Sequence, residues 1–294
     1  MPTNAIMGNS RGANAAHARR VVSKTAGTAL VHAVLIVGAI FMALPFVWMI
    51  LTSLKDDSEV FTYSLQWLPS KLNFDGYKEV WTEISFARMY LNSFIVAGGI
   101  TICQLITSAL AGYAFARLDF PGRDTVFMIY LSAMMIPHQA TVIPSFILVR
   151  NLGMVDKYSA LILPFAAGPF GAFMLRQFFL GMPRSLEEAA IIDGCSRFGV
   201  LRHVVLPLCK PAMVTLGLFQ FMFAWNDFMW PLIVTNKMSM RTLQVGLALL
   251  RAEASTNWPM LMAATVLATV PVLVAFLAAQ RQFIESIAFT GLKY

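Results

Sequence analysis

Long uncharged segments alternate with short charged ones along the chain. Five windows contain no Asp, Glu, Lys or Arg, and a sixth, between Lys210 and Lys237, is interrupted only by Asp227. About 20 apolar residues in a helix cross the hydrocarbon core of a bilayer, and continuously apolar windows do not fit the alternating strands of a barrel. The pattern therefore predicts an all-α membrane protein with six transmembrane helices, placed near 28–51, 89–112, 125–149, 158–180, 211–234 and 259–280.

The composition agrees with this interpretation. Of the 294 residues, 58% are hydrophobic and 13% are charged, whereas soluble domains have about 25% charged residues. A soluble enzyme and a disordered chain are excluded, and three cysteines in apolar or cytosolic segments do not form a disulfide scaffold. The net charge of +7 is typical of a membrane protein with basic cytoplasmic loops, so we expect no nucleic-acid partner.

An even number of spans places both termini on the same side of the membrane. Residues 1–27 contain four basic residues and no acid, whereas the loop over 52–88 is rich in acids. Since basic residues favour the cytoplasm, we expect both termini to be cytoplasmic. This predicts a loose basic tail over 1–27 and one transmembrane domain over 28–294, with 52–88 outside and the loop 182–209 in the cytoplasm. The first apolar stretch is too long for a signal peptide, and we interpret it as an anchor.

Prolines and glycines are frequent within the predicted spans. Pro137, Pro144 and Pro169 are examples, with Gly168 beside the last of them. These residues let helices kink, pack closely and line cavities, as is common in transporters. The alternative is that they are ordinary residues of membrane helices.

The loop 182–209 contains the most specific pattern of the chain. Ser185 and Glu188 have the spacing of a capping box, which predicts a short helix that ends at Gly194. Ser196 can cap a second short helix, whose apolar face would contain Phe198, Leu201 and Val205. Two short helices that meet at a glycine form a compact docking element. The alternative is a loop that lies along the membrane surface.

Several residues of this loop resemble a known family motif. They are Glu188, Ala189, Ala190, Gly194, Val204, Leu206 and Pro207. Their spacing resembles the EAA loop of binding-protein-dependent ABC importer permeases, whose consensus has Ile in place of Val204. The resemblance implies the type I permease fold of these importers. It also implies that the loop is a coupling helix, which inserts into a cleft of a cytosolic ATPase subunit through Glu188, Ala189, Ala190, Gly194, Leu206 and Pro207.

The resemblance extends over most of the chain. Asn92-Ser93, the segment 136–139, Leu175-Arg-Gln-Phe-Phe179 and the segment 225–232 are similar to the carbohydrate branch of that family, which includes the maltose and glycerol-phosphate permeases. It implies import of a sugar, oligosaccharide or sugar phosphate across the bacterial inner membrane. The implied partners are a homologous permease subunit, two ATPase subunits that hold ATP and Mg²⁺, and an extracytoplasmic substrate-binding protein.

Polar residues inside the spans are the candidates for contact with substrate. Asp227 is the only acid in a predicted span, and an intramembrane carboxylate usually faces a cavity or a partner. With Trp225 and Asn226 beside it, it could bind sugar hydroxyls while an indole stacks on the sugar. It could equally cap a neighbouring helix or contact the sibling subunit. His138 is a second candidate, with a hydrogen bond to a neighbouring carbonyl as the alternative.

The sequence contains no recognisable catalytic machinery. A Gly-Lys dipeptide does not occur, so there is no phosphate-binding P-loop, and no histidine has metal-ligand spacing to other donors. We therefore expect a chain without enzymatic activity, cofactor or metal. The rival interpretation is a secondary transporter driven by an ion gradient, for which one Asp and one mid-span His would be a sparse relay.

Overall fold

The computed structural model describes residues 7–62, 66–83, 85–252 and 257–291. Over these ranges the chain is helical and contains no strand. The all-α prediction is therefore confirmed for the described part of the chain.

Three helices are long and apolar enough to cross a membrane without interruption. They are α1 (Met7–Thr52), α4 (Phe86–Arg117) and α15 (Trp258–Gly291). The predicted spans 28–51, 89–112 and 259–280 fall within them. The tail expected to be loose is instead the first part of α1 from Met7 onward, because its many alanines favour a helix and no proline interrupts it.

Three further segments are pairs of helices bent at a short break. In the first, α5 and η1 (Arg123–Ser132, Ala133–Met135) meet α6 (His138–Asn151) at an angle of 99°. In the second, α7 and η2 (Tyr158–Ile162, Leu163–Phe165) meet α8 (Pro169–Leu180) at 44°. In the third, the helical segment Arg197–Leu208 meets α12 (Lys210–Asn226) at 82°. The predicted spans 125–149 and 158–180 are therefore broken rather than continuous. Pro137 and Pro169 stand at these two breaks, since proline cannot continue the hydrogen bonding of a preceding helix.

The remaining elements are short. They are α2 (Asp57–Val60), α3 (Asp75–Glu83), α9 (Arg184–Ile192), α10 (Arg197–Val200), the π-helical turn η3 (Leu201–Val205), α11 (Leu206–Leu208), α13 (Met229–Val234), η4 (Met238–Met240) and α14 (Leu243–Ala252). The predicted span 211–234 consists of α12 followed by α13, because the backbone becomes extended at Asp227.

Helix α4 is the centre of the bundle and packs against α8, α12 and α14. Small residues allow close contact between α4 and α8. A Cβ atom added to Gly171 would lie 2.1 Å from Ser108 Oγ, and one added to Gly112 would lie 3.2 Å from the Ala172 carbonyl oxygen. Glycine at such points lets the backbones of membrane helices approach each other.

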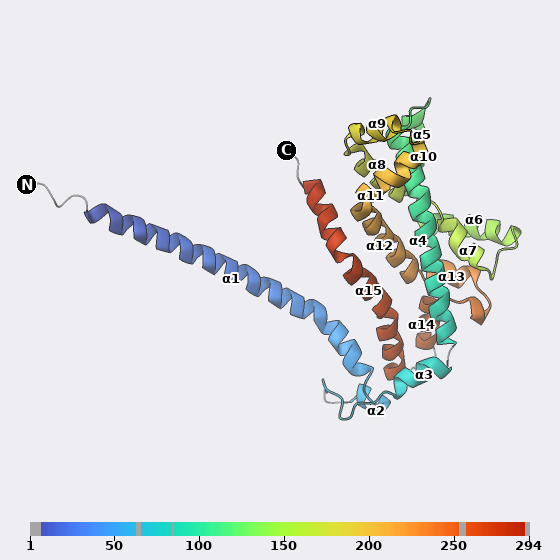
Figure 1. Ribbon diagram of the computed structural model, residues 1–294. Coiled ribbons are helices and arrows are strands. Elements are labelled where there is room, and N and C mark those ends of the chain that lie inside the picture. The colour runs from blue at the N-terminus through green and yellow to red at the C-terminus, as the bar shows by residue number, and fades with distance from the viewer. Residues whose placement is uncertain (1–6, 63–65, 84, 253–256, 292–294) are drawn as a thin grey trace, which may run out of the picture.

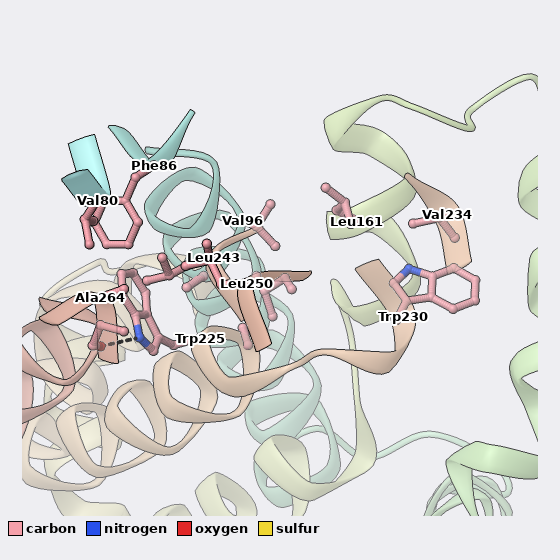
Figure 2. Close-up of a cluster of buried hydrophobic side chains, with 14 of the residues drawn as sticks. Val80, Phe86, Val96, Leu161, Trp225, Trp230, Val234, Leu243, Leu250 and Ala264 are labelled. Atoms are coloured by element: carbon pink, nitrogen blue, oxygen red, sulfur yellow. Dashed lines mark hydrogen bonds between the residues drawn. The ribbon is translucent and has the colours of Figure 1, made fainter. Parts of the chain in front are cut away.

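The buried side chains form two clusters along α4. One contains Phe86, Trp225, Trp230 and Leu243, and Figure 2 shows its two indoles in separate regions, with Trp225 near Ala264 and Trp230 near Leu161 and Val234. The other lies around Tyr113, Phe179 and Val205. The two clusters give each end of α4 its own packed surroundings.

Figure 1 shows where the short elements lie relative to the long helices. The helices α9 and α10 lie at one end of α4, and α2 and α3 lie at the other. Helix α1 diverges from the bundle, and its apolar side chains from Leu30 to Ile40 are largely exposed. A long helix that is apolar on all sides requires lipid or another protein around it.

Candidate functional site: the loop 182–209 and a cavity in the bundle

The first element of the 182–209 loop is α9, which begins one residue before the predicted capping residue. Its N-cap is Pro183, and no side chain caps it. Ser185 therefore lies inside the first turn, and the predicted capping box with Glu188 is wrong. Proline fixes φ near the value a helix start needs, and Pro183 has φ −60° and ψ 127°, so the chain enters the helix without a serine cap.

Gly194 ends α9 as predicted. Its φ is +90°, a conformation that L side chains rarely adopt. The amide of Gly194 donates to the Ile191 carbonyl at 3.0 Å, and the amide of Cys195 donates to the Ala190 carbonyl at 2.9 Å, which is the hydrogen bonding of a glycine C-cap. Ser196 then caps α10, because its Oγ accepts from the Gly199 amide at 3.1 Å. Both of these predictions are confirmed.

The α9–Gly194–α10 element, which we call the knob (residues 184–200), presents an exposed surface. Glu188, Ala189, Gly194 and Pro207 are exposed, and Ala190 and Leu206 are half-buried. Ile192 is 85% exposed and Phe198 61%, whereas Leu201 and Val205 are buried. Phe198 therefore does not share the buried face predicted for it. Phe198 instead enlarges an exposed apolar surface, and contact of such a surface with water is unfavourable.

Glu187, which the sequence analysis did not select, is the buried carboxylate of the knob. Its Oε1 accepts a hydrogen bond from Arg117 Nε at 2.5 Å, and the two side chains are 7% and 4% exposed. Arg117 Nη2 also donates to the Met182 carbonyl at 2.8 Å, and Tyr113 Oη lies 3.4 Å from Glu187 Oε2. We call these four residues the Arg117 clasp. The only sequence signal was a pair of adjacent carboxylates, which cannot both face the same side of a helix.

Cys209 lies beside this clasp. Its Sγ is 3.3 Å from Met182 Sδ, and the residue is buried. Burial raises the pKa of the Cys209 thiol to about 11, although the positive charge of Arg117 acts in the opposite direction. The thiol is therefore protonated at neutral pH and reacts slowly while the loop stays packed.

A cavity of about 770 Å³ opens where the broken segments meet. Its polar lining residues are Gln104, His138, Thr141, Ser145 and Gln220. Its aromatic lining residues are Phe165, Phe170, Phe219, Phe223 and Trp230. Aromatic faces with a few polar groups form the usual lining of a binding cavity. Gln104 is the notable member, because its Nε2 donates to the Phe165 carbonyl at 2.8 Å while its buried Oε1 has no partner.

Of the four predicted substrate residues, His138 lines this cavity. His138 begins α6, lies at the cavity wall and packs edge-on against Phe165 with ring centroids 5.3 Å apart. Asp227 is not part of the cavity wall, and its Oδ1 accepts from the Trp230 amide at 3.4 Å. The N-cap residue of α13 is Phe228, but the Asp227 carboxylate bonds an amide in the first turn of this helix, which agrees with the capping alternative predicted for it.

The other two predicted residues point elsewhere. Trp225 is 1% exposed, and its Nε1 donates to the Ala268 carbonyl at 3.0 Å, so its indole is part of the core (Figure 2). Asn226 donates to the Met222 carbonyl at 2.8 Å on its own helix. In this conformation neither lines the cavity. Gln104 and Gln220 do so instead, and their signal in the sequence was a lone amide within an apolar helix.

A second buried polar group lies at the other end of α4. Asn92 is 0% exposed, and its Nδ2 donates to the carbonyls of Ser239 and Arg241, each at 2.9 Å, while its Oδ1 accepts from Tyr158 Oη at 2.7 Å. The neighbouring Ser93 Oγ accepts from the Leu243 amide at 2.8 Å. We call this group the Asn92 clasp. It holds the segment before α14 against α4.

No group of three or more His, Cys, Asp or Glu side chains that could hold a metal ion occurs among the described residues. A bundle of up to six spans, with a cavity at the broken helices and an exposed helical knob at one end, defines a membrane transport subunit.

Comparison with known proteins identifies the family. Residues 104–287 match the family described as "binding-protein-dependent transport system inner membrane component". The chain belongs to this family and is a multi-pass permease subunit of the ABC importer class. The rival interpretation, an ion-gradient-driven transporter, finds no support in these comparisons.

The similar proteins cover nearly the whole chain. It is 35% identical to the arabinooligosaccharides transport system permease protein AraQ of Bacillus subtilis, over 85% of this chain and 90% of the relative. It is 34% identical to the sulfoquinovosyl glycerol transport system permease protein SmoH of Agrobacterium fabrum, over 88% and 91%. A crystal structure of a bacterial ABC transporter for import of the polysaccharide alginate has a chain with TM-score 0.79 and 25% identity, over 86% of this chain and 95% of that one.

Proposed function

We propose that the chain is one of two permease subunits of an ATP-driven importer for a carbohydrate or a carbohydrate-like polyol. The observation that carries the proposal is the cavity, where hydrogen-bonding amides and aromatic faces converge at the two breaks before α6 and α8. The names of these relatives refer to transport of arabinooligosaccharides and sulfoquinovosyl glycerol, both of which contain sugar rings with several hydroxyl groups.

In this proposal the knob faces the cytoplasm and α2 and α3 face outward. The chain then lies in the inner membrane of a bacterium with both termini inside, as the basic residues of 1–27 and the acids of 52–88 favour. A binding protein delivers substrate from outside, and this agrees with the family description.

The cavity supplies this subunit's wall of the transport path. Gln104, His138 and Gln220 donate and accept hydrogen bonds to hydroxyl groups, and the exposed rings of Phe219 and Phe223 contact the C–H faces of the sugar. Asp227 accepts a hydrogen bond from the amide of Trp230, whose side chain belongs to the cavity wall. The sibling permease closes the cavity from the opposite side.

The knob couples the path to two ATPase subunits, which hold ATP and Mg²⁺. Glu188, Ala189 and Ala190 offer a small, exposed helical surface, and Ile192 and Phe198 add apolar contact area that a groove can bury. Gly194 sets the angle between the two short helices, and Leu206 and Pro207 join the knob to α12.

The proposal is tested with the complete complex in proteoliposomes. Gly194→Val forces a side chain into φ +90° and should reduce ATP-dependent uptake about tenfold or more, because such backbone strain costs about 1–3 kcal/mol. Gly153→Val is the matched control, since it has φ +63° and open space around its Cβ but lies between α6 and α7. Normal uptake by the Gly194 variant would contradict the coupling role. Uptake by the wild type that needs an ion gradient and no ATP would replace the proposal with the secondary transporter.

A further inference from the structure

One guanidinium group connects the knob to the centre of the bundle. Arg117 contacts Glu187 within the first turn of α9 and also the carbonyl of Met182 just before that helix. The knob is also joined to the bundle through the chain at α8 and α11 and through Val200 and Ala190, which pack in the buried cluster around Tyr113 and Phe179. The Arg117 clasp therefore gives α9 a direct attachment to α4, which lies 65 to 70 residues earlier in the sequence.

This attachment is a buried ion pair rather than an ordinary surface contact. Both side chains are more than nine-tenths buried. Burial of two charges is costly, and apolar residues of similar size usually stabilise such a site as well or better. The geometry that the pair imposes, one fixed position of α9 on α4, is the property that apolar replacements would not reproduce.

Helix α4 connects this clasp to the cavity. It contains no proline between Phe86 and Arg117, and Gln104 lies 13 residues before Arg117, roughly 20 Å at the rise of an α-helix. Gln104 lines the cavity and donates to the Phe165 carbonyl at the break before α8. The Arg117 end of α4 and the cavity wall at Gln104 therefore belong to one uninterrupted helix.

We propose that the Arg117–Glu187 pair transmits movement of the knob to α4, so that α9 and α4 shift as one body when the ATPase subunits close. Arg117 and Glu187 are positioning residues in this scheme and do not touch the substrate. The inference rests on the proposed function, because it assumes that the knob receives the movement from an ATPase.

The test compares ATP hydrolysis with uptake in proteoliposomes that contain the complete complex. Glu187→Gln keeps the shape of the side chain but removes its charge. We expect ATPase subunits to co-purify and ATP hydrolysis to continue, while substrate imported per ATP falls about tenfold, within the usual range of coupling between sites. Asp119→Asn is the matched control, because Asp119 pairs with Arg123 in a nearby loop at 87% exposure, and it should leave the ratio unchanged.

The double variant Arg117→Met with Glu187→Leu separates positioning from packing. This double variant fills the site with apolar atoms, so it should fold without a buried unpaired charge. The amount of substrate imported per ATP should nevertheless remain low. Slow labelling of Cys209 by a maleimide, with Cys103 and Cys195 replaced by serine, reports that the loop is still packed. Wild-type import per ATP in either clasp variant would overturn the inference. If no ATPase subunits co-purify with the wild-type chain, that result would instead contradict the proposed function.

Discussion

The two ends of α4 are held by different chemistry. At one end the Asn92 clasp uses a neutral amide whose partners are two backbone carbonyls and a tyrosine hydroxyl. At the other end the Arg117 clasp uses two opposite charges on side chains of separate helices. The first clasp joins a side chain to the main chain of a loop, whereas the second joins two side chains on separate helices.

The same comparison explains why the two clasps differ in how they can be replaced. Both partners of the ion pair are side chains, so both can be exchanged for apolar residues at once. The partners of Asn92 are mostly main-chain carbonyls, which no substitution removes. A change at Asn92 therefore leaves buried polar groups without partners.

The largest expected effect is the loss of one charge from the Arg117 clasp. Arg117→Met leaves Glu187 buried and unpaired, and we expect it to lower the free energy of unfolding by about 3–5 kcal/mol. Adding Glu187→Leu should return most of that loss. Thermal unfolding of the purified complex measures both variants. A double variant as unstable as the single one would show that the cost does not come from the unpaired carboxylate.

The next effect concerns the Asn92 clasp. Asn92→Leu leaves the carbonyls of Ser239 and Arg241 unsatisfied in a fully buried site, and we expect a loss of about 3 kcal/mol. Asn151→Leu is the matched control, because Asn151 is exposed at the end of α6 and should change stability by less than about 0.5 kcal/mol. If the two variants unfold at the same temperature, the prediction that Asn92 stabilises the fold is wrong.

The sequence alone predicted much of the bundle but little of these clasps. Each predicted span overlaps a long apolar helix or a bent helix pair, because charge is excluded from the bilayer core whatever the tertiary structure is. The end of α9 at Gly194 and the cap at Ser196 were also predictable, since they depend on local backbone geometry. The breaks at Pro137 and Pro169 were visible only as prolines, because a kinked helix and a broken one have the same residues.

The clasps depend on contacts between distant parts of the chain. Arg117 and Glu187 are separated by 70 residues, and Asn92 and Ser239 by 147. Nothing local distinguishes Glu187 from Glu188, although one is buried and the other exposed. Trp225 was predicted to contact substrate but lies in the core, because a tryptophan beside an intramembrane carboxylate is compatible with a sugar site and with a packed core alike. Only packing decided between these alternatives.

The smallest expected effect concerns Asp156, which forms a third tether between distant segments. This tether is charged and lies beside the Asn92 clasp. Asp156 has φ +61°, and its Oδ1 accepts from the amides of Asn236 and Lys237 at 2.6 and 2.9 Å. These amides hold the pKa of the Asp156 carboxyl below its usual value. Because the folded pKa is lowered, the stabilisation is fully present above the ordinary pKa of an aspartate, near 4, and is lost as the pH falls through the folded value.

The stability difference between the wild type and Asp156→Asn should accordingly be constant from pH 7 to about pH 5 and should shrink below pH 4. Thermal unfolding of the purified complex across this range measures it, with Asp57→Asn, an exposed acid in α2, as the control. Since the neutral Asn92 clasp has no group that titrates there, the cost of Asn92→Leu should not depend on pH in the same window. A parallel pH dependence of both costs would mean that acid loosens this whole end of the molecule, and the contrast between a neutral and a charged tether would not hold.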